Sequence, residues 1–108
     1  KAGLELSEVD VVDMHEAFAA QVLSVLKMLG SQAFARERLG RDRAVGEIDP
    51  EKLNIYGGSI AIGHPFAATG ARIVTTLANE LHRSQKQTAL LGICAAGGLG
   101  AAAVLERV

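Results

Sequence analysis

Three side chains in this 108-residue sequence could transfer a proton near neutral pH: His15, His64 and Cys94. Each comes at or just after a short apolar segment, which reads VDVVDM before His15, SIAIG before His64 and TALLGI before Cys94. Imidazole titrates near pH 7, and a thiol can serve as an acid, a base or a nucleophile. The residue types therefore point to acid–base or thiol chemistry, provided that the fold brings the three together.

His64 lies in a stretch that is dense in small residues, GGSIAIGHPFAATGARIV over 57–74. Glycine and alanine at this density allow two backbones, or a backbone and a ligand, to approach closely. Pro65 suits the first turn of a helix, because an N–H would be unpaired there. The positive end of that helix dipole disfavours a second proton on the His64 ring. We therefore expect His64 to be neutral and able to accept a proton.

Each of these residues also has a structural interpretation. A single histidine is often a capping or a hydrogen-bonded core residue, and a buried thiol is often inert. The two histidines and Cys94 could also bind zinc. Their spacing is not characteristic of a zinc site, and we expect no metal. We expect His82, on the polar end of a predicted helix, to be solvated.

The segments around these residues alternate between strand and helix patterns. The sequence predicts strands at 9–14, 53–62, 88–98 and 99–108, helices at 16–29 and 65–82, and a charged surface segment at 36–52. Gly30 is expected to end the first helix in the left-handed conformation. The order β-α-β-α-β-β, with strands apolar on both faces, favours an α/β domain with a mostly parallel sheet and a terminal antiparallel hairpin. Strand C-termini would then bring His15, His64 and Cys94 to one edge of the sheet.

The composition is that of one domain, which we assign to residues 1–108. Apolar residues make up 49% of the chain, aromatic residues only 4%, and the formal net charge is −1, so we expect no nucleic-acid partner. Because no apolar run approaches 18 residues and no signal peptide is visible, we expect a protein that is neither exported nor membrane-spanning. A single cysteine fits a reducing compartment.

Three blocks together resemble the C-terminal domain of a thiolase: HEAF at 15–18, GGSIAIGHPFAATGAR at 57–72 and CAAGGLGAA at 94–102. The resemblance covers essentially the whole chain and implies the C-terminal half of the thiolase fold. Phe66, a histidine rather than an asparagine at 15, and the charged insertion at 31–52 resemble the 3-ketoacyl-CoA thiolases of fatty-acid β-oxidation.

The resemblance implies roles for the three candidate residues. In a thiolase, a nucleophilic cysteine is acylated by 3-ketoacyl-CoA as acetyl-CoA leaves, and coenzyme A then takes the acyl group. His64 would activate that nucleophile and hydrogen-bond a thioester oxygen in an oxyanion hole, and Cys94 would be the acid and base at the acetyl α-carbon. His15 stands where the family's usual asparagine holds a water in the first oxyanion hole. The N–H of Ala96 would serve the second.

The resemblance also implies what surrounds this site. Gly63, Phe18 and Gly58 would help to position the substrate, and coenzyme A would be a substrate, so that no cofactor is expected. The nucleophilic cysteine of the family belongs to an N-terminal domain that this sequence lacks. We therefore expect half an active site and a chain that is inactive alone.

Partners and alternatives follow from the same resemblance. The expected partners are acyl-CoA or coenzyme A, the N-terminal thiolase domain, further copies in a homo-oligomer and the α-subunit of a fatty-acid oxidation complex. The expected location is cytoplasmic in a bacterium and mitochondrial in a eukaryote. An acetoacetyl-CoA thiolase, a condensing enzyme of fatty-acid or polyketide synthesis, and a non-catalytic thiolase-like binding or assembly module remain as alternatives.

Overall fold

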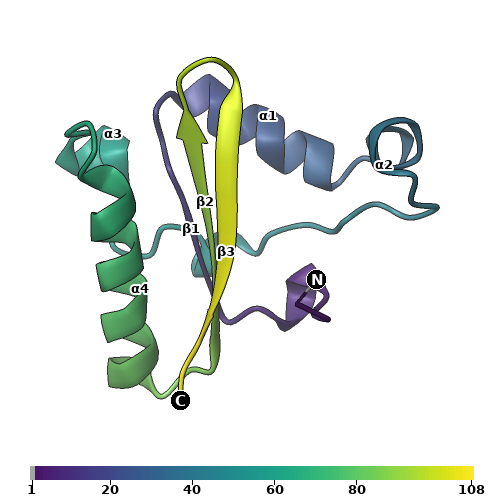
Figure 1. Cartoon of the computed structure of the whole chain (residues 1–108). Helices are drawn as coiled ribbons and strands as arrows, with labels where there is room; N and C mark the ends of the chain where they lie inside the picture. The colour runs from purple at the N-terminus through teal and green to yellow at the C-terminus, as the bar shows by residue number, and fades with distance from the viewer. Residues whose placement is uncertain (1) are drawn as a thin grey trace.

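The computed structural model describes residues 2–108, so that Lys1 of the expected domain lies outside the described residues (Figure 1). In chain order the elements are η1 (Leu6–Glu8), β1 (Val11–Met14), α1 (Ala19–Leu29), α2 (Gln32–Leu39), η2 (Pro50–Lys52), α3 (Ser59–Ile62), α4 (Thr69–Ser84), β2 (Thr88–Ala95) and β3 (Leu99–Glu106). The chain is thus a small α/β domain, as expected.

The three strands form one sheet in the order β1-β2-β3. β1 and β2 are parallel, with Val11 opposite Ala89, and β2 and β3 are antiparallel. The terminal hairpin is therefore confirmed, and its turn contains two glycines in the left-handed region, Gly97 at φ 82° and Gly98 at φ 74°. The expectation of a mostly parallel sheet is wrong, because one strand pair is parallel and the other is antiparallel.

Helix α4 packs along one face of the sheet, as Figure 1 shows. Ile73, Leu77 and Leu81 follow one another at intervals of four residues, so that they lie on one side of the helix. All three are buried against β1 and β2 in the main core, whose members are Val11, Ile73, Leu77, Leu81, Ala89 and Leu91. This packing fixes the helix against the parallel strand pair whose C-terminal ends carry His15 and Cys94.

The opposite side of the sheet carries α1 (Figure 1). Val22 of α1 is buried, as are Val12 and Met14 of β1. The predicted helix at 16–29 is confirmed from residue 19 onwards, because Phe18 is still extended. Gly30 does not cap it in the left-handed conformation, since its φ is −79°.

The predicted strand at 53–62 is wrong. Leu53 forms an isolated parallel bridge with Val12, and there the pairing stops. Asn54 adopts a positive φ of 48°, and its side-chain amide hydrogen-bonds both the N–H and the carbonyl of Met14, at 2.7 and 2.9 Å. An amide side chain thus takes the place of the next strand residue, and the backbone leaves the sheet towards α3.

The second predicted helix begins later than expected. Residues 65–68 form a turn, and α4 begins at Thr69 and extends to Ser84. Ala67 has a φ of 65°, in the left-handed region that a continuous α-helix excludes. Pro65 therefore lies before the helix, and the turn that follows it separates His64 from α4.

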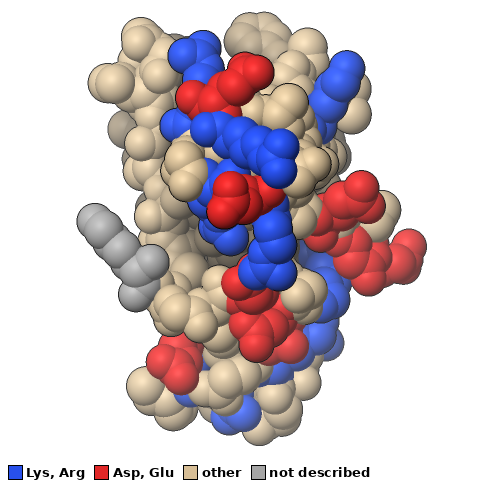
Figure 2. All heavy atoms as spheres, turned by 90° about the vertical axis from the view of Figure 1, so that its right-hand side faces the viewer, with Lys and Arg blue, Asp and Glu red and all other residues tan. Residues whose placement is uncertain are grey.

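The charged segment contains a helix, α2, that its sequence does not predict. Ser31 caps α2 by accepting a hydrogen bond from the N–H of Phe34 at 3.2 Å, and Gly40 ends α2 at φ 63°. Figure 2 shows the face that carries α2, where acidic and basic side chains alternate; Glu5, for example, lies 4.0 Å from Arg41. Among residues 2–108, no helix is long and apolar enough to span a membrane.

Candidate active site

His15, His64 and Cys94 lie in one line of side-chain contacts. The Sγ atom of Cys94 is 3.4 Å from Nδ1 of His15, and Nε2 of His15 is 3.2 Å from Nδ1 of His64. The two imidazole rings meet edge to face, with centroids 4.4 Å apart. The prediction that these three residues converge is confirmed.

The parallel strand pair positions two of the three residues. His15 directly follows β1, and its N–H donates to the carbonyl of Gly92 at 2.8 Å, which continues the ladder beyond the end of the strand. Cys94 lies two residues further along β2 than Gly92. Both residues therefore stand at the C-terminal edge of the pair, where ligands of open α/β sheets bind.

His64 reaches the same place from a loop and not from a strand end. The loop follows α3, and Gly63 adopts φ 101° and ψ 163°, a conformation that is essentially restricted to glycine. Glu16 ties this region to the end of β1: its carboxylate accepts hydrogen bonds from the Asn54 amide at 2.8 Å and from the N–H of Ile60 at 3.1 Å. The loop is thus held beside the residue that follows His15.

The Glu16 carboxylate leaves no room for a side chain at Gly58. A Cβ atom at Gly58 would overlap the carboxylate of Glu16. At Gly58, the backbone therefore comes close to the Glu16 side chain and not to a ligand. Gly58 and Gly63 do not belong to the described lining of the adjoining cavity, and their expected part in positioning the substrate stays a prediction.

A cavity of about 500 Å³ opens beside the three residues. Its lining is His15, Ala17, Phe18, Gln21, His64, Phe66, Ala67, Thr69, Gly70, Ile93, Cys94, Ala95 and Ala96. Phe18 and Phe66 belong to this lining although they are 74% and 84% exposed. The cavity is mostly apolar, with the imidazoles and the thiol as its reactive groups, which is typical of a small-molecule site.

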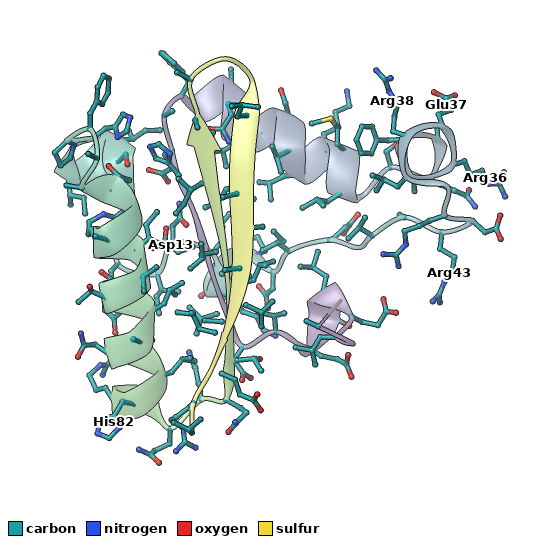
Figure 3. The ribbon with its side chains drawn as sticks, viewed as in Figure 1. Asp13, Arg36, Glu37, Arg38, Arg43 and His82 are labelled. Atoms are coloured by element: carbon teal, nitrogen blue, oxygen red, sulfur yellow. The ribbon has the colours of Figure 1, made fainter. Side chains whose placement is uncertain are left out.

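Burial determines the ionisation of the residues beneath the cavity. His15 is 2% exposed, and this burial lowers its pKa from the ordinary value of 6.5; the neighbouring His64 lowers it further. Figure 3 shows Asp13 between the sheet and α4. Burial raises the pKa of Asp13, although the Arg72 guanidinium lies 3.8 Å from its carboxylate. His15 is consequently neutral at pH 7 and can both donate and accept a hydrogen bond.

Two polar residues of the site, Thr69 and Gln21, are not among the residues predicted from the sequence. Thr69 is 3% exposed, and its Oγ1 atom lies 2.8 Å from Nδ1 of His64. Gln21 on α1 has its Oε1 atom 3.9 Å from the Cys94 sulfur. Thr69 could have been found as the first polar residue after the HPFAA turn, whereas nothing in the sequence separates Gln21 from an ordinary surface residue.

The remaining polar candidates lie elsewhere. Figure 3 shows His82 near the end of α4 that lies away from α3, and its side chain is exposed as expected. The labelled residues Arg36, Glu37 and Arg38 project from α2, away from α4 (Figure 3). Within the described part of the chain, no group of three or more His, Cys, Asp or Glu side chains is arranged to hold a metal ion. The groups that the structure brings together at the cavity are thus two imidazoles and one thiol, between which a proton can pass.

Known proteins match almost the whole length of this chain. A family model described as the thiolase C-terminal domain matches residues 1–107. The chain is 57% identical over 106 residues to a 3-ketoacyl-CoA thiolase of Colwellia psychrerythraea, and 58% identical to those of Shewanella woodyi and Yersinia pestis. These alignments cover 98% of this chain and 24% of each relative, so that the chain spans about a quarter of their length.

Proposed function

The chain belongs to the thiolase family as a C-terminal domain, and on that premise we propose that it supplies the acid–base half of a 3-ketoacyl-CoA thiolase active site. The full-length protein would cleave 3-ketoacyl-CoA with coenzyme A to give acetyl-CoA and a shortened acyl-CoA. The observation that carries the proposal is the line of contacts from Cys94 through His15 to His64 beside one apolar cavity.

His64 is the base in this proposal. The nucleophilic cysteine, which comes from outside this chain, gives its proton to the ring of His64 and attacks the 3-keto carbon. The protonated ring then donates a hydrogen bond to the oxygen that develops negative charge. A positioned base contributes about 10²- to 10⁴-fold to such a step, and the neighbouring rings of His15 and Phe66 hold His64 at the cavity.

Cys94 is the second acid–base group. As the bond between the α-carbon and the keto carbon breaks, the Cys94 thiol protonates the α-carbon, and acetyl-CoA leaves. The thiolate then takes the proton of the incoming coenzyme A thiol, whose sulfur attacks the acyl-enzyme and releases the shortened acyl-CoA. The nucleophilic cysteine leaves as a thiolate and recovers its proton from His64. Cys94 and His64 thus return to their starting forms, and no external proton donor is consumed.

The proposal also names the partners of this domain. Exposed apolar side chains such as Ile60, Phe66 and Leu99 would contact the remainder of the full-length protein. We assign coenzyme A the role of a substrate and not of a bound cofactor. A homo-oligomer, a fatty-acid oxidation complex with an α-subunit, and a cytoplasmic location are part of the proposal, because the matched relatives are bacterial 3-ketoacyl-CoA thiolases.

The test is a product analysis on the full-length protein. It is incubated with coenzyme A and 3-ketoacyl-CoA substrates of increasing chain length, and acetyl-CoA and the shortened acyl-CoA are quantified by mass spectrometry. Turnover of long chains supports the proposal, whereas turnover of acetoacetyl-CoA alone would assign an acetoacetyl-CoA thiolase. Acyl-CoA binding without turnover would assign a binding module. The same analysis is repeated on His64→Gln, which removes the proposed base and should lose turnover. His82→Gln is its matched control, because His82 is exposed and remote from the cavity.

A further inference from the structure

Thr69, the first residue of α4, places its hydroxyl against the ring of His64. The Oγ1 atom lies 2.8 Å from Nδ1 of His64 and 3.2 Å from the carbonyl oxygen of Pro65. Thr69 is 3% exposed, so that bulk water does not compete for these contacts. A buried hydroxyl with two such partners can give its one hydrogen to only one of them, and it offers its lone pairs to the other.

The two partners of the Thr69 hydroxyl differ in their hydrogen-bonding roles. A carbonyl oxygen can only accept, whereas Nδ1 of a neutral imidazole can be either a donor or an acceptor. The Thr69 hydroxyl therefore donates to the carbonyl of Pro65, four residues earlier in the chain, as threonine commonly does in helices. Its lone pairs then face His64, which favours a hydrogen on Nδ1.

His15 can accept this hydrogen. Its Nε2 atom is the other neighbour of His64 Nδ1, at 3.2 Å, while its Nδ1 atom faces the sulfur of Cys94 at 3.4 Å. Because burial keeps His15 neutral, one of its two ring nitrogens is free to accept. With the hydrogen of His15 on Nδ1, towards Cys94, its Nε2 atom accepts from His64.

We propose that Thr69 is a positioning residue that holds His64 in the Nδ1–H tautomer, so that its Nε2 atom keeps a free lone pair for the proton of the nucleophile. This inference rests on the proposed function for its catalytic meaning. The logic is that of a catalytic triad, in which an acceptor at Nδ1 leaves Nε2 as the base. Here the acceptors are a hydroxyl and a second imidazole.

The tautomer itself is the first measurement. Full-length protein labelled with ¹⁵N in histidine is examined by long-range ¹H–¹⁵N correlation at pH 8, and the His64 signals are assigned by their loss in His64→Gln. We expect a protonated Nδ1 and an unprotonated Nε2. Thr69→Val, which keeps the side-chain shape but removes the acceptor, should raise the population of the Nε2–H form, and Thr69→Ser should not. An Nε2–H tautomer in the unmodified protein would overturn the proposal, whether or not Thr69→Val folds.

The second measurement concerns thiolysis. A positioned base contributes about 10²- to 10⁴-fold, and the wrong tautomer forfeits part of it. Thr69→Val should therefore lower kcat about 10- to 100-fold with KM within about twofold. Thr69→Ser should restore kcat to within about threefold of the unmodified protein, because it keeps the acceptor. Unchanged kcat in folded Thr69→Val would contradict the proposal. An unmodified protein without thiolysis would refute the proposed function, while the ¹⁵N spectrum would still decide the tautomer.

Discussion

The Nε2 atom of His15 lies 3.2 Å from the Nδ1 atom of His64, although the two residues are separated by 49 positions in the chain. One ring follows a strand and the other sits on a loop, and the Glu16 carboxylate, which accepts from Asn54 and Ile60, ties the two segments together. Each ring can use the other as a hydrogen-bond partner. A change in the protonation of one ring therefore changes the hydrogen-bonding role of the other.

His15→Leu tests this relationship. The substitution replaces the ring by an apolar side chain and removes its hydrogen-bond contacts with His64 and with Cys94. Asparagine is unsuitable as the replacement, because that residue is usual at this position in the family and could take over the role. Since a positioned base contributes about 10²- to 10⁴-fold, we expect kcat for thiolysis by the full-length protein to fall about 10- to 100-fold in His15→Leu. His82→Leu serves as the control, because it changes a solvent-exposed histidine. An unchanged kcat in His15→Leu would mean that the contact between the two rings has no catalytic role.

Cys94→Ser separates the two acid–base groups. A serine hydroxyl is a much weaker acid than a thiol, so proton transfer to the acetyl α-carbon should fail and thiolysis should fall about 10²- to 10⁴-fold. Acylation of the enzyme by acetyl-CoA needs His64 as the base and no proton transfer at carbon, because coenzyme A can leave as a thiolate. It should therefore survive better, which intact-mass measurement can quantify. Near-normal thiolysis in Cys94→Ser would refute the role assigned to this thiol.

The chain of 108 residues should be inactive by itself. Its one cysteine is Cys94, which faces His15 and Gln21, and the proposed base His64 does not contact it directly. After incubation of the isolated chain with acetyl-CoA, we expect intact-mass measurement to detect no acetyl adduct and product analysis to detect no cleavage of 3-ketoacyl-CoA. A stoichiometric adduct on Cys94 together with turnover would instead make this domain an enzyme in its own right.

Glu80 should make the stability of the domain sensitive to acid. Tyr56 donates a hydrogen bond to the buried carboxylate and lowers its pKa to about 2, and Arg83 contributes a further bond at 2.6 Å. A depressed carboxyl pKa stabilises the fold above the ordinary value of 4.5, and this stabilisation disappears as the pH falls towards 2. Because Arg83 is largely exposed, we expect roughly 1–2 kcal/mol.

The measurement is the thermal midpoint of the full-length protein between pH 6 and pH 2.5. Glu80→Gln should lower the midpoint at pH 6 and reduce its dependence on pH in this range, because the amide does not titrate. The matched control is Glu106→Gln, at the end of the exposed strand β3. An equally steep acid dependence in Glu80→Gln would show that other carboxylates determine it.

Much of the site could be predicted because its positions follow from strand pairing. The apolar runs around β1 and β2 identify two parallel strands, and parallel strands place the residues at their C-terminal ends side by side. His15 and Cys94 therefore had to be neighbours once the strands were paired. The hairpin was equally predictable, because two glycines follow an apolar strand of this length.

The position of His64 could not be derived in the same way. The sequence LNIYGGSIAI reads as a strand, but the Asn54 side chain takes both backbone hydrogen bonds that a continuing strand would make with Met14. The Asn54 side chain can replace a strand residue only because the fold brings Met14 next to it, and no local sequence pattern shows that contact. The helix at Gln32–Leu39 was missed for a different reason, since its charged residues carry almost no apolar periodicity.

Gly58 and Glu16 provide a final test of how the His64 loop is held. Gly58→Ala would place a methyl group on the carboxylate of Glu16, which then has to give up its bonds to Asn54 or to the N–H of Ile60. Buried overlaps of this kind typically cost about 1–3 kcal/mol. We therefore expect Gly58→Ala to destabilise the full-length protein and to lower kcat, because His64 moves with the loop.

The double variant decides whether Glu16 is the cause. Glu16→Ala removes the carboxylate, so that the methyl group of Gly58→Ala finds free space in that background. Contacting residues are energetically coupled, and the second substitution should then add less than about 0.5 kcal/mol to the destabilisation and leave kcat at the level of Glu16→Ala. Equal effects of Gly58→Ala in both backgrounds would mean that backbone conformation, and not the carboxylate, requires glycine at this position. The φ of Gly58, −122°, is open to any residue, which favours the carboxylate.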